Sequence, residues 1–148
     1  MPPLQDTAPA PVAVVLDTNA ALDWLVFRDH RMAPLAQAIE QRQATWLATA
    51  TMRRELAEVI RRLKLAQRQA DSERPLTMFD VLAQHRHEPP PAPPGLLCTD
   101  PADQVFLDLA AAEKARWLIT RDKALLALRR RALAHGLFIA PPEAWRAD

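Results

Sequence analysis

The stretch V12-A-V-V-L-D-T-N-A-A-L22 joins a continuous apolar run to three polar residues. An uninterrupted run of Val, Ala and Leu, rather than an alternating one, is typical of a strand buried on both faces of a parallel sheet. Apolar residues resume after Asn19, so the stretch predicts a strand that ends at Asp17 and leads directly into a helix. Asp17, Thr18 and Asn19 are then either a simple turn or one corner of a functional site.

Strand and helix patterns alternate along the rest of the chain. Strands are expected at 12–17, 45–49, 116–120 and 137–140 with a minimal one at 96–98, and helices at 20–27, 32–43, 52–65, 101–115 and 123–135. This alternation predicts an α/β fold in which helices cover both faces of a parallel sheet. The remaining region predicts a broken helix over 66–87 and a stiff proline-rich connector over 87–95.

Length and composition limit the possible functions. With 148 residues, the chain suits a single domain over 12–148 that is preceded by a flexible tail over 1–11. Only two glycines are present, which excludes a P-loop and a dinucleotide-binding fingerprint. The net charge of +1 gives no bulk attraction to polyanions, and the single cysteine excludes an internal disulfide. With no signal-peptide pattern and no apolar run of membrane-spanning length, we expect a cytoplasmic protein that does not bind membranes.

Two aspartates directly follow predicted strands. Asp17 follows the strand at 12–16 and Asp122 follows the strand at 116–120. Because ligands of parallel sheets bind beyond the carboxyl ends of the strands, we expect both carboxylates at the same edge of the sheet.

Helical periodicity separates two further acids from their neighbours. Asp103 shares the inward face of its helix with Phe106 and Leu107, whereas Asp108 is expected to point to solvent. Glu55 borders the apolar stripe of the helix at 52–65. Glu58 lies on the outer side of that helix, where it is expected to pair with Arg54 and Arg62 at the surface.

Each acid also has an ordinary structural explanation. Asp17 can open an Asx turn, Asp122 can cap a helix, and Asp100 before Pro101 suits a cap with Asp103 in the first helical turn. Separate caps do not explain why these acids should gather at one edge, where like charges are unfavourable without a cation. Since no Cys/His ligand set accompanies them, an all-oxygen site favours Mg²⁺ or Mn²⁺ and phosphodiester hydrolysis.

Four motifs, in this order and spacing, resemble those of PIN-domain ribonucleases, most closely the branch classed as toxins of toxin–antitoxin pairs. They are L16-D-T-N19, R53-R-E-L-A-E-V-I60, D100-P-A-D-Q-V-F-L-D-L-A110 and L118-I-T-R-D-K-A-L-L126. The resemblance runs from about residue 12 to 145. It implies a three-layer α/β/α sandwich with a central parallel sheet and a metal-dependent endoribonuclease activity.

The resemblance also implies site residues. The acidic quartet would be Asp17, Glu55, Asp103 and Asp122; the three aspartates would hold the metal, and Glu55 would orient or deprotonate the attacking water. Asp100 would be an auxiliary acid or merely the helix cap, while Asn19 and Thr120 would support the site. The family likeness further implies RNA as substrate, a small antitoxin as a partner and a homodimer.

Several weaker signals have competing interpretations. Arg53 and Arg54 are the best candidates for binding RNA phosphates, but they also suit a solvated helix face. His85 and His87 are expected at the surface rather than on a metal, and the four tryptophans in the core.

Two other functions compete with the nuclease. One is a catalytically silent PIN-like scaffold that binds RNA or protein. The other is a haloacid-dehalogenase-like phosphatase, which ranks low because its second acid would fall at Asn19.

Overall fold

The computed structural model describes residues 11–67 and 73–147. A five-stranded, all-parallel sheet forms its centre, with the strands in the order β3-β2-β1-β4-β5. The strands are β1 (Val12–Leu16), β2 (Ala44–Thr49), β3 (Ala83–Arg86), β4 (Trp117–Ile119) and β5 (Phe138–Ala140). The expected tail over 1–11 lies almost wholly outside the described residues.

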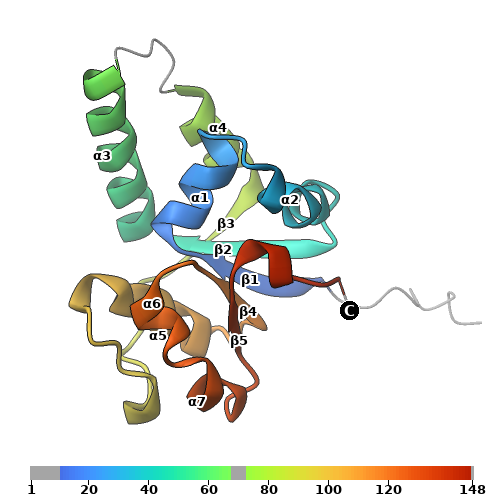
Figure 1. Ribbon diagram of the computed structural model, residues 1–148, viewed down its shortest axis with the longest axis vertical. Coiled ribbons are helices and arrows are strands. Elements are labelled where there is room, and N and C mark those ends of the chain that lie inside the picture. Colours follow the sequence, from blue (N-terminus) through green and yellow to red (C-terminus); the bar gives the residue numbers. More distant parts are fainter. Residues whose placement is uncertain (1–10, 68–72, 148) are drawn as a thin grey trace, which may run out of the picture.

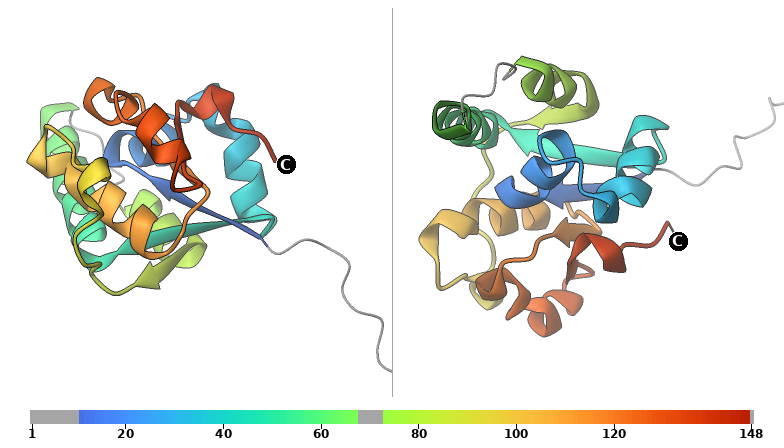
Figure 2. Two further views of the ribbon diagram at one scale, coloured as in Figure 1. Left: turned by 90° about the horizontal axis from the view of Figure 1, so that it is seen from below. Right: turned by 45° about the horizontal axis from the view of Figure 1, so that its top comes forward.

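Helices cover both faces of this sheet, which makes a three-layer α/β/α sandwich (Figure 1). One layer contains α1 (Thr18–Leu25), α2 (Ala33–Glu40), α3 (Ala50–Gln67) and α4 (Glu73–Leu82). The opposite layer contains α5 (Gln104–Ala112), α6 (Lys123–Leu126) and α7 (Arg129–Leu133). The right-hand view of Figure 2 shows the same separation of the blue and green helices from the orange ones. The predicted fold class is therefore confirmed.

The two central strands explain the continuous apolar run. Val14 and Val15 on β1, and Leu118 and Ile119 on β4, are each 0% exposed, because helices cover both of their faces. Burial of such side chains away from water is the main favourable contribution to folding. The four tryptophans are also buried, as predicted, at positions 24, 46, 117 and 145.

The region between α4 and α5 differs from its prediction. Residues 83–86, expected within a broken helix, form the edge strand β3, whose polar sequence AQHR carries no strand pattern because it is exposed or half-buried. The minimal strand expected at 96–98 is wrong: the 3₁₀ helix η2 (Pro94–Leu96) occupies its start, and the Leu96 N–H donates to the Pro93 carbonyl instead of to a neighbouring strand. Part of the broken helix, 68–72, lies outside the described residues.

The helix predicted over 123–135 is divided into α6 and α7. Leu128 has φ −94° and ψ 2° at the junction, which ends the first helical segment and starts the second. The turn keeps Leu125, Leu128 and Ala132 buried against the sheet. After α7 ends at Leu133, Gly136 has a φ of +73°, a conformation that glycine adopts at little cost.

Candidate functional site

The site lies at the carboxyl ends of the two central strands. Leu16 of β1 pairs with Ile119 of β4, so the next residues, Asp17 and Thr120, lie at the same level of the sheet. The connections change from one face of the sheet to the other at these two strands, which is where parallel α/β sheets usually bind ligands.

Asp17 is held on both of its carboxylate oxygens. Oδ1 accepts a hydrogen bond from the Ala20 N–H at 2.8 Å, which caps α1, and Oδ2 accepts one from the Thr120 hydroxyl. Thr120 Oγ1 in turn accepts from the Asp122 N–H at 2.9 Å. Thr120 therefore joins the loop after β1 to the loop after β4 through two hydrogen bonds.

Burial makes Asp17 costly to ionise. Only 4% of the residue is exposed, and this burial raises its pKa to about 6 despite the two hydrogen bonds, with a smaller contribution from the charge of Asp122. A carboxylate in this position gains from a nearby cation.

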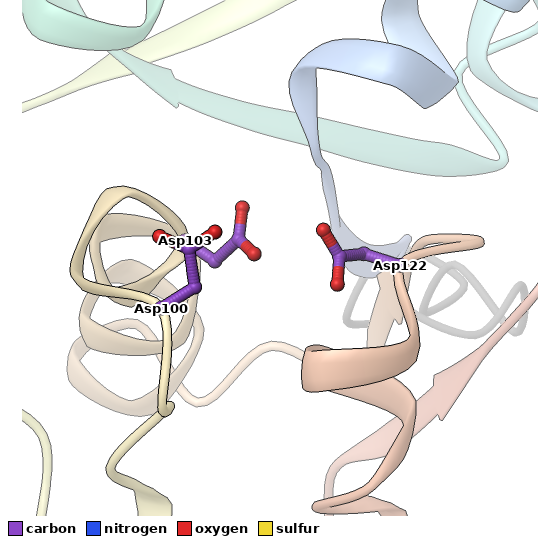
Figure 3. Close-up of side chains that lie close together, drawn as sticks. All are labelled: Asp100, Asp103 and Asp122. Carbon is purple, nitrogen blue, oxygen red and sulfur yellow. The ribbon is translucent and has the colours of Figure 1, made fainter.

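Three further aspartates converge beside this corner. The carboxylate groups of Asp100, Asp103 and Asp122 each offer an oxygen within 4.8 Å of the others (Figure 3). They come from the 3₁₀ helix η3 (Pro101–Asp103), the loop before it and the loop between β4 and α6. The sequence predicted that Asp103 and Asp122 share an edge with Asp17.

Helix capping explains some of these acids but not all. Asp100 accepts from the Ala102 N–H at 3.0 Å and Asp122 accepts from the Ala124 N–H at 2.8 Å, each through Oδ1. Each cap leaves the second oxygen available. Asp103 makes no cap bond, and its Oδ2 is buried without a hydrogen-bond partner. The structural and functional explanations are thus compatible at Asp100 and Asp122. Asp103 lies in the first turn of its helix, as the structural explanation expected, but that placement does not account for its buried, unpartnered Oδ2.

The surroundings of Asp103 favour a proton or a cation. Burial raises its pKa to about 7, and the adjoining carboxylate of Asp122 and the charges of Asp100 and Asp17 act in the same direction. An all-carboxylate set with one unpartnered buried oxygen fits a hard divalent cation, which binds oxygen ligands.

The group of mutually close carboxylates contains Asp100, Asp103 and Asp122; Asp17 and the remaining predicted site residues are not members of it. Glu55 is half-buried on α3, and among the described residues it does not join the group of mutually close carboxylates. Asn19 lies exposed in the first turn of α1.

The two arginines expected to bind substrate have different surroundings. Arg53 donates from Nε and Nη2 to the Asp80 carboxylate at 2.6 and 2.8 Å, whereas Arg54 is exposed. The Asp80 carboxylate thus already neutralises one of them.

Two other acids differ from their expected surroundings. Asp108 does not point to solvent: its Oδ1 accepts from the Ala92 N–H at 2.8 Å and from Gln104 Nε2 at 3.0 Å, which fastens the proline-rich segment to α5. Glu58 pairs with Arg61, three residues further along the helix, at 2.5 Å.

Arg121 was not predicted as a site residue. This residue lies between Thr120 and Asp122 and forms ion pairs with Asp23 and Glu143. The only sequence signal was its position: alternation along an extended chain places the side chain between two site residues on the opposite side.

Comparisons with known proteins identify the fold and the family. One chain of the crystal structure of VapBC2 from Rickettsia felis, bound to a DNA fragment from their promoter, superposes with a TM-score of 0.56 and 14% sequence identity. The alignment covers 90% of the present chain and 99% of that chain, so the two share a fold. No curated protein matches the sequence. The family model of the PIN domain matches residues 13–124, a span that includes Asp17, Asp103 and Asp122, and the chain therefore belongs to the PIN-domain family.

Proposed function

We propose that this protein is a metal-dependent endoribonuclease. The observation that carries the proposal is the convergence of Asp100, Asp103 and Asp122 beside the buried Asp17, where no cationic side chain pairs with them among the described residues. Membership of the PIN-domain family supports the same activity, because the sequence resemblance to PIN-domain ribonucleases implies a metal-binding acidic set that includes Asp17, Asp103 and Asp122.

The metal would be Mg²⁺ or Mn²⁺, held by Asp17, Asp103 and Asp122 directly or through water, with Asp100 as an auxiliary acid. When bound, such an ion generates hydroxide from water and neutralises charge on a phosphoryl group. The unpartnered Oδ2 of Asp103 supports this assignment, because a buried carboxylate oxygen without a donor is unfavourable until a cation binds near it.

The protein's own side chains prepare this site. Ala20 and Thr120 hold the Asp17 carboxylate in one orientation, so it needs no reorganisation when the substrate arrives. Glu55, at the edge of α3, would orient the attacking water or accept its proton. Arg54 is the better candidate for binding an RNA phosphate, because Asp80 already neutralises Arg53.

We further propose that the protein is the toxin of a toxin–antitoxin pair. Its structural similarity to a chain of VapBC2 supports this role, together with the sequence resemblance to the toxin branch of the family. A small antitoxin protein would then cover the acidic edge, and the protein would act on RNA in the cytoplasm as a monomer or homodimer. No helix in the described parts of the chain has both the length and the apolar character required to cross a membrane.

RNA cleavage by matched variants tests the nuclease assignment. Asp17→Asn and Asp103→Asn should abolish Mg²⁺-dependent cleavage of a structured RNA while the circular dichroism spectrum stays that of the wild type. Asp80→Asn, a surface aspartate paired with Arg53, is the control and should retain activity. Equal cleavage by the wild type and Asp17→Asn would refute the assignment.

The alternative is a catalytically silent PIN-like scaffold that binds RNA or protein. Its acids would need no cation, so calorimetry with Mn²⁺ separates the two functions. A nuclease should take up Mn²⁺ with an affinity that Asp122→Ala abolishes, whereas a silent scaffold should show no such uptake.

A further inference from the structure

The side chains of the three consecutive residues after β4 have two different sets of neighbours. Thr120 and Asp122 belong to the acidic site, and Arg121 between them reaches three other carboxylates. Its Nε lies 3.3 Å from Asp23 Oδ2, and its Nη1 lies 2.9 Å from Glu143 Oε1.

The third carboxylate lies further away. Arg121 Nη2 is 4.0 Å from Asp29 Oδ2 and is buried without a hydrogen-bond partner. Only 28% of the Arg121 side chain is exposed, so this guanidinium is less screened by water than those of the surface pairs.

The three carboxylates belong to three different segments. Asp23 lies on α1, the helix that Asp17 caps; Asp29 caps the 3₁₀ helix η1 (His30–Met32); and Glu143 lies in the 3₁₀ helix η4 (Pro142–Ala144). One planar guanidinium therefore connects the β4–α6 corner to α1 and to the segment that follows β5. A guanidinium suits this task because its donors are fixed in a fork, which the single ammonium of a lysine does not reproduce.

The site is sensitive to the position of this corner. The Thr120 hydroxyl donates to Asp17 across it, and the Asp122 carboxylate meets Asp100 and Asp103 from it. A small displacement of the corner relative to α1 would lengthen the Thr120–Asp17 hydrogen bond and separate the carboxylate oxygens. Groups that orient metal ligands in this way typically change metal affinity 10- to 100-fold when they are replaced.

We infer that Arg121 is a positioning residue for the proposed metal site: it holds the corner carrying Thr120 and Asp122 in register with Asp17 by binding Asp23 and Glu143. The inference rests on the proposed function. It assigns Arg121 no contact with metal or substrate.

Mn²⁺ titration calorimetry of Arg121→Lys tests the inference. This variant keeps the positive charge but replaces the planar guanidinium, with its several fixed donors, by a single ammonium. We expect its Kd for Mn²⁺ to rise about tenfold or more. Arg86→Lys is the matched control, because Arg86 Nε pairs with Glu113 at 2.7 Å and is similarly exposed at 36%, but on the edge strand β3. It should bind Mn²⁺ with the affinity of the wild type.

Each possible result is decisive. A Kd for Arg121→Lys within twofold of the wild type, in a folded protein, overturns the inference and leaves the nuclease proposal intact. A wild type that binds no Mn²⁺ refutes the nuclease proposal itself, and the inference with it. If Arg121→Lys does not fold, Glu143→Gln replaces it, since it removes the acceptor that lies 2.9 Å from Arg121 Nη1: weaker Mn²⁺ binding supports the inference, and unchanged binding overturns it.

Discussion

The carboxylates of the site and those of the outer surface have opposite surroundings. Burial raises the pKa values of Asp17 and Asp103 to about 6 and about 7. By contrast, hydrogen bonds from arginines hold the pKa values of Asp29, Asp80 and Glu58 below their usual range, through Arg31, Arg53 and Arg61 respectively. The chain has 19 Lys and Arg for 18 Asp and Glu, so overall composition supplies enough cations. Among the described residues, however, no Lys or Arg forms an ion pair with Asp100, Asp103 or Asp122, which is the group where we propose that a divalent cation binds.

Replacing one acid of the proposed site should reduce RNA cleavage far more than replacing one acid of the outer surface. Asp122→Asn takes away an oxygen from the cluster and should lower kcat/KM for RNA cleavage at least about 10²-fold, the scale associated with loss of one group that stabilises charge in the transition state. Initial rates with saturating Mg²⁺ measure this effect. Asp80→Asn should retain the wild-type rate, and a similar loss in both variants would contradict the distinction between the two groups.

The two groups should also respond to pH in different ranges. Since Asp17 and Asp103 have raised pKa values, the metal-free folded state binds more protons than the unfolded state between about pH 4 and pH 7, and its stability should fall as pH rises through this window. For the buried Asp17, a shift from 3.8 to about 6 corresponds to roughly 3 kcal/mol at pH 7. Urea unfolding at several pH values in EDTA measures this loss.

Mn²⁺ supplies the control for the pH experiment. A bound cation favours the ionised carboxylates, so saturating Mn²⁺ should remove most of the loss at pH 7. The arginine-paired acids have lowered pKa values, and their contribution is lost only below about pH 4, as pH falls through their folded-state values. Metal-free stability that increases from pH 4 to pH 7 would contradict the raised pKa values.

Two buried threonines, Thr120 and Thr49, allow a role at the site to be distinguished from ordinary helix capping. Thr120→Val removes the hydroxyl that donates to Asp17, and we expect about tenfold weaker Mn²⁺ binding by calorimetry. Thr49→Val is the matched control: Thr49 is also 0% exposed, and its hydroxyl accepts from the Met52 N–H at 3.2 Å. Both variants should lose about 1 kcal/mol of stability, but unchanged Mn²⁺ binding in Thr120→Val would exclude its role at the site.

The smallest expected effect is the change in the free energy of unfolding when an arginine-paired surface acid is replaced. Asp80→Asn breaks an ion pair with Arg53 in which both side chains are about half exposed, at 51% and 42%. Solvent screening should keep the loss in free energy of unfolding below about 1 kcal/mol in urea titrations at moderate salt. A larger loss would show that these surface pairs contribute more to the fold than their exposure implies.

Local sequence patterns predicted most of the framework. The apolar runs of β1 and β4 are buried on both faces, and the amphipathic pattern of α3 places Met52, Leu56 and Ile60 in the core. The same patterns placed Asp17 and Asp122 at one edge, because parallel strands end together. The polar strand β3 carried no such pattern, since an exposed edge strand places few side chains in the core.

The amino-acid sequence by itself determined most of the alternation of strands and helices, the family, and the position of Asp17 and Asp122 directly after strands, because each follows from local patterns and their order along the chain. Only the tertiary structure decided which groups meet across long separations. The Thr120 hydroxyl reaches Asp17 over 103 residues, and Arg121 reaches Asp23 over 98. Such contacts depend on strand order and on the packing of α1 against the β4–α6 corner, which no periodicity in the sequence encodes.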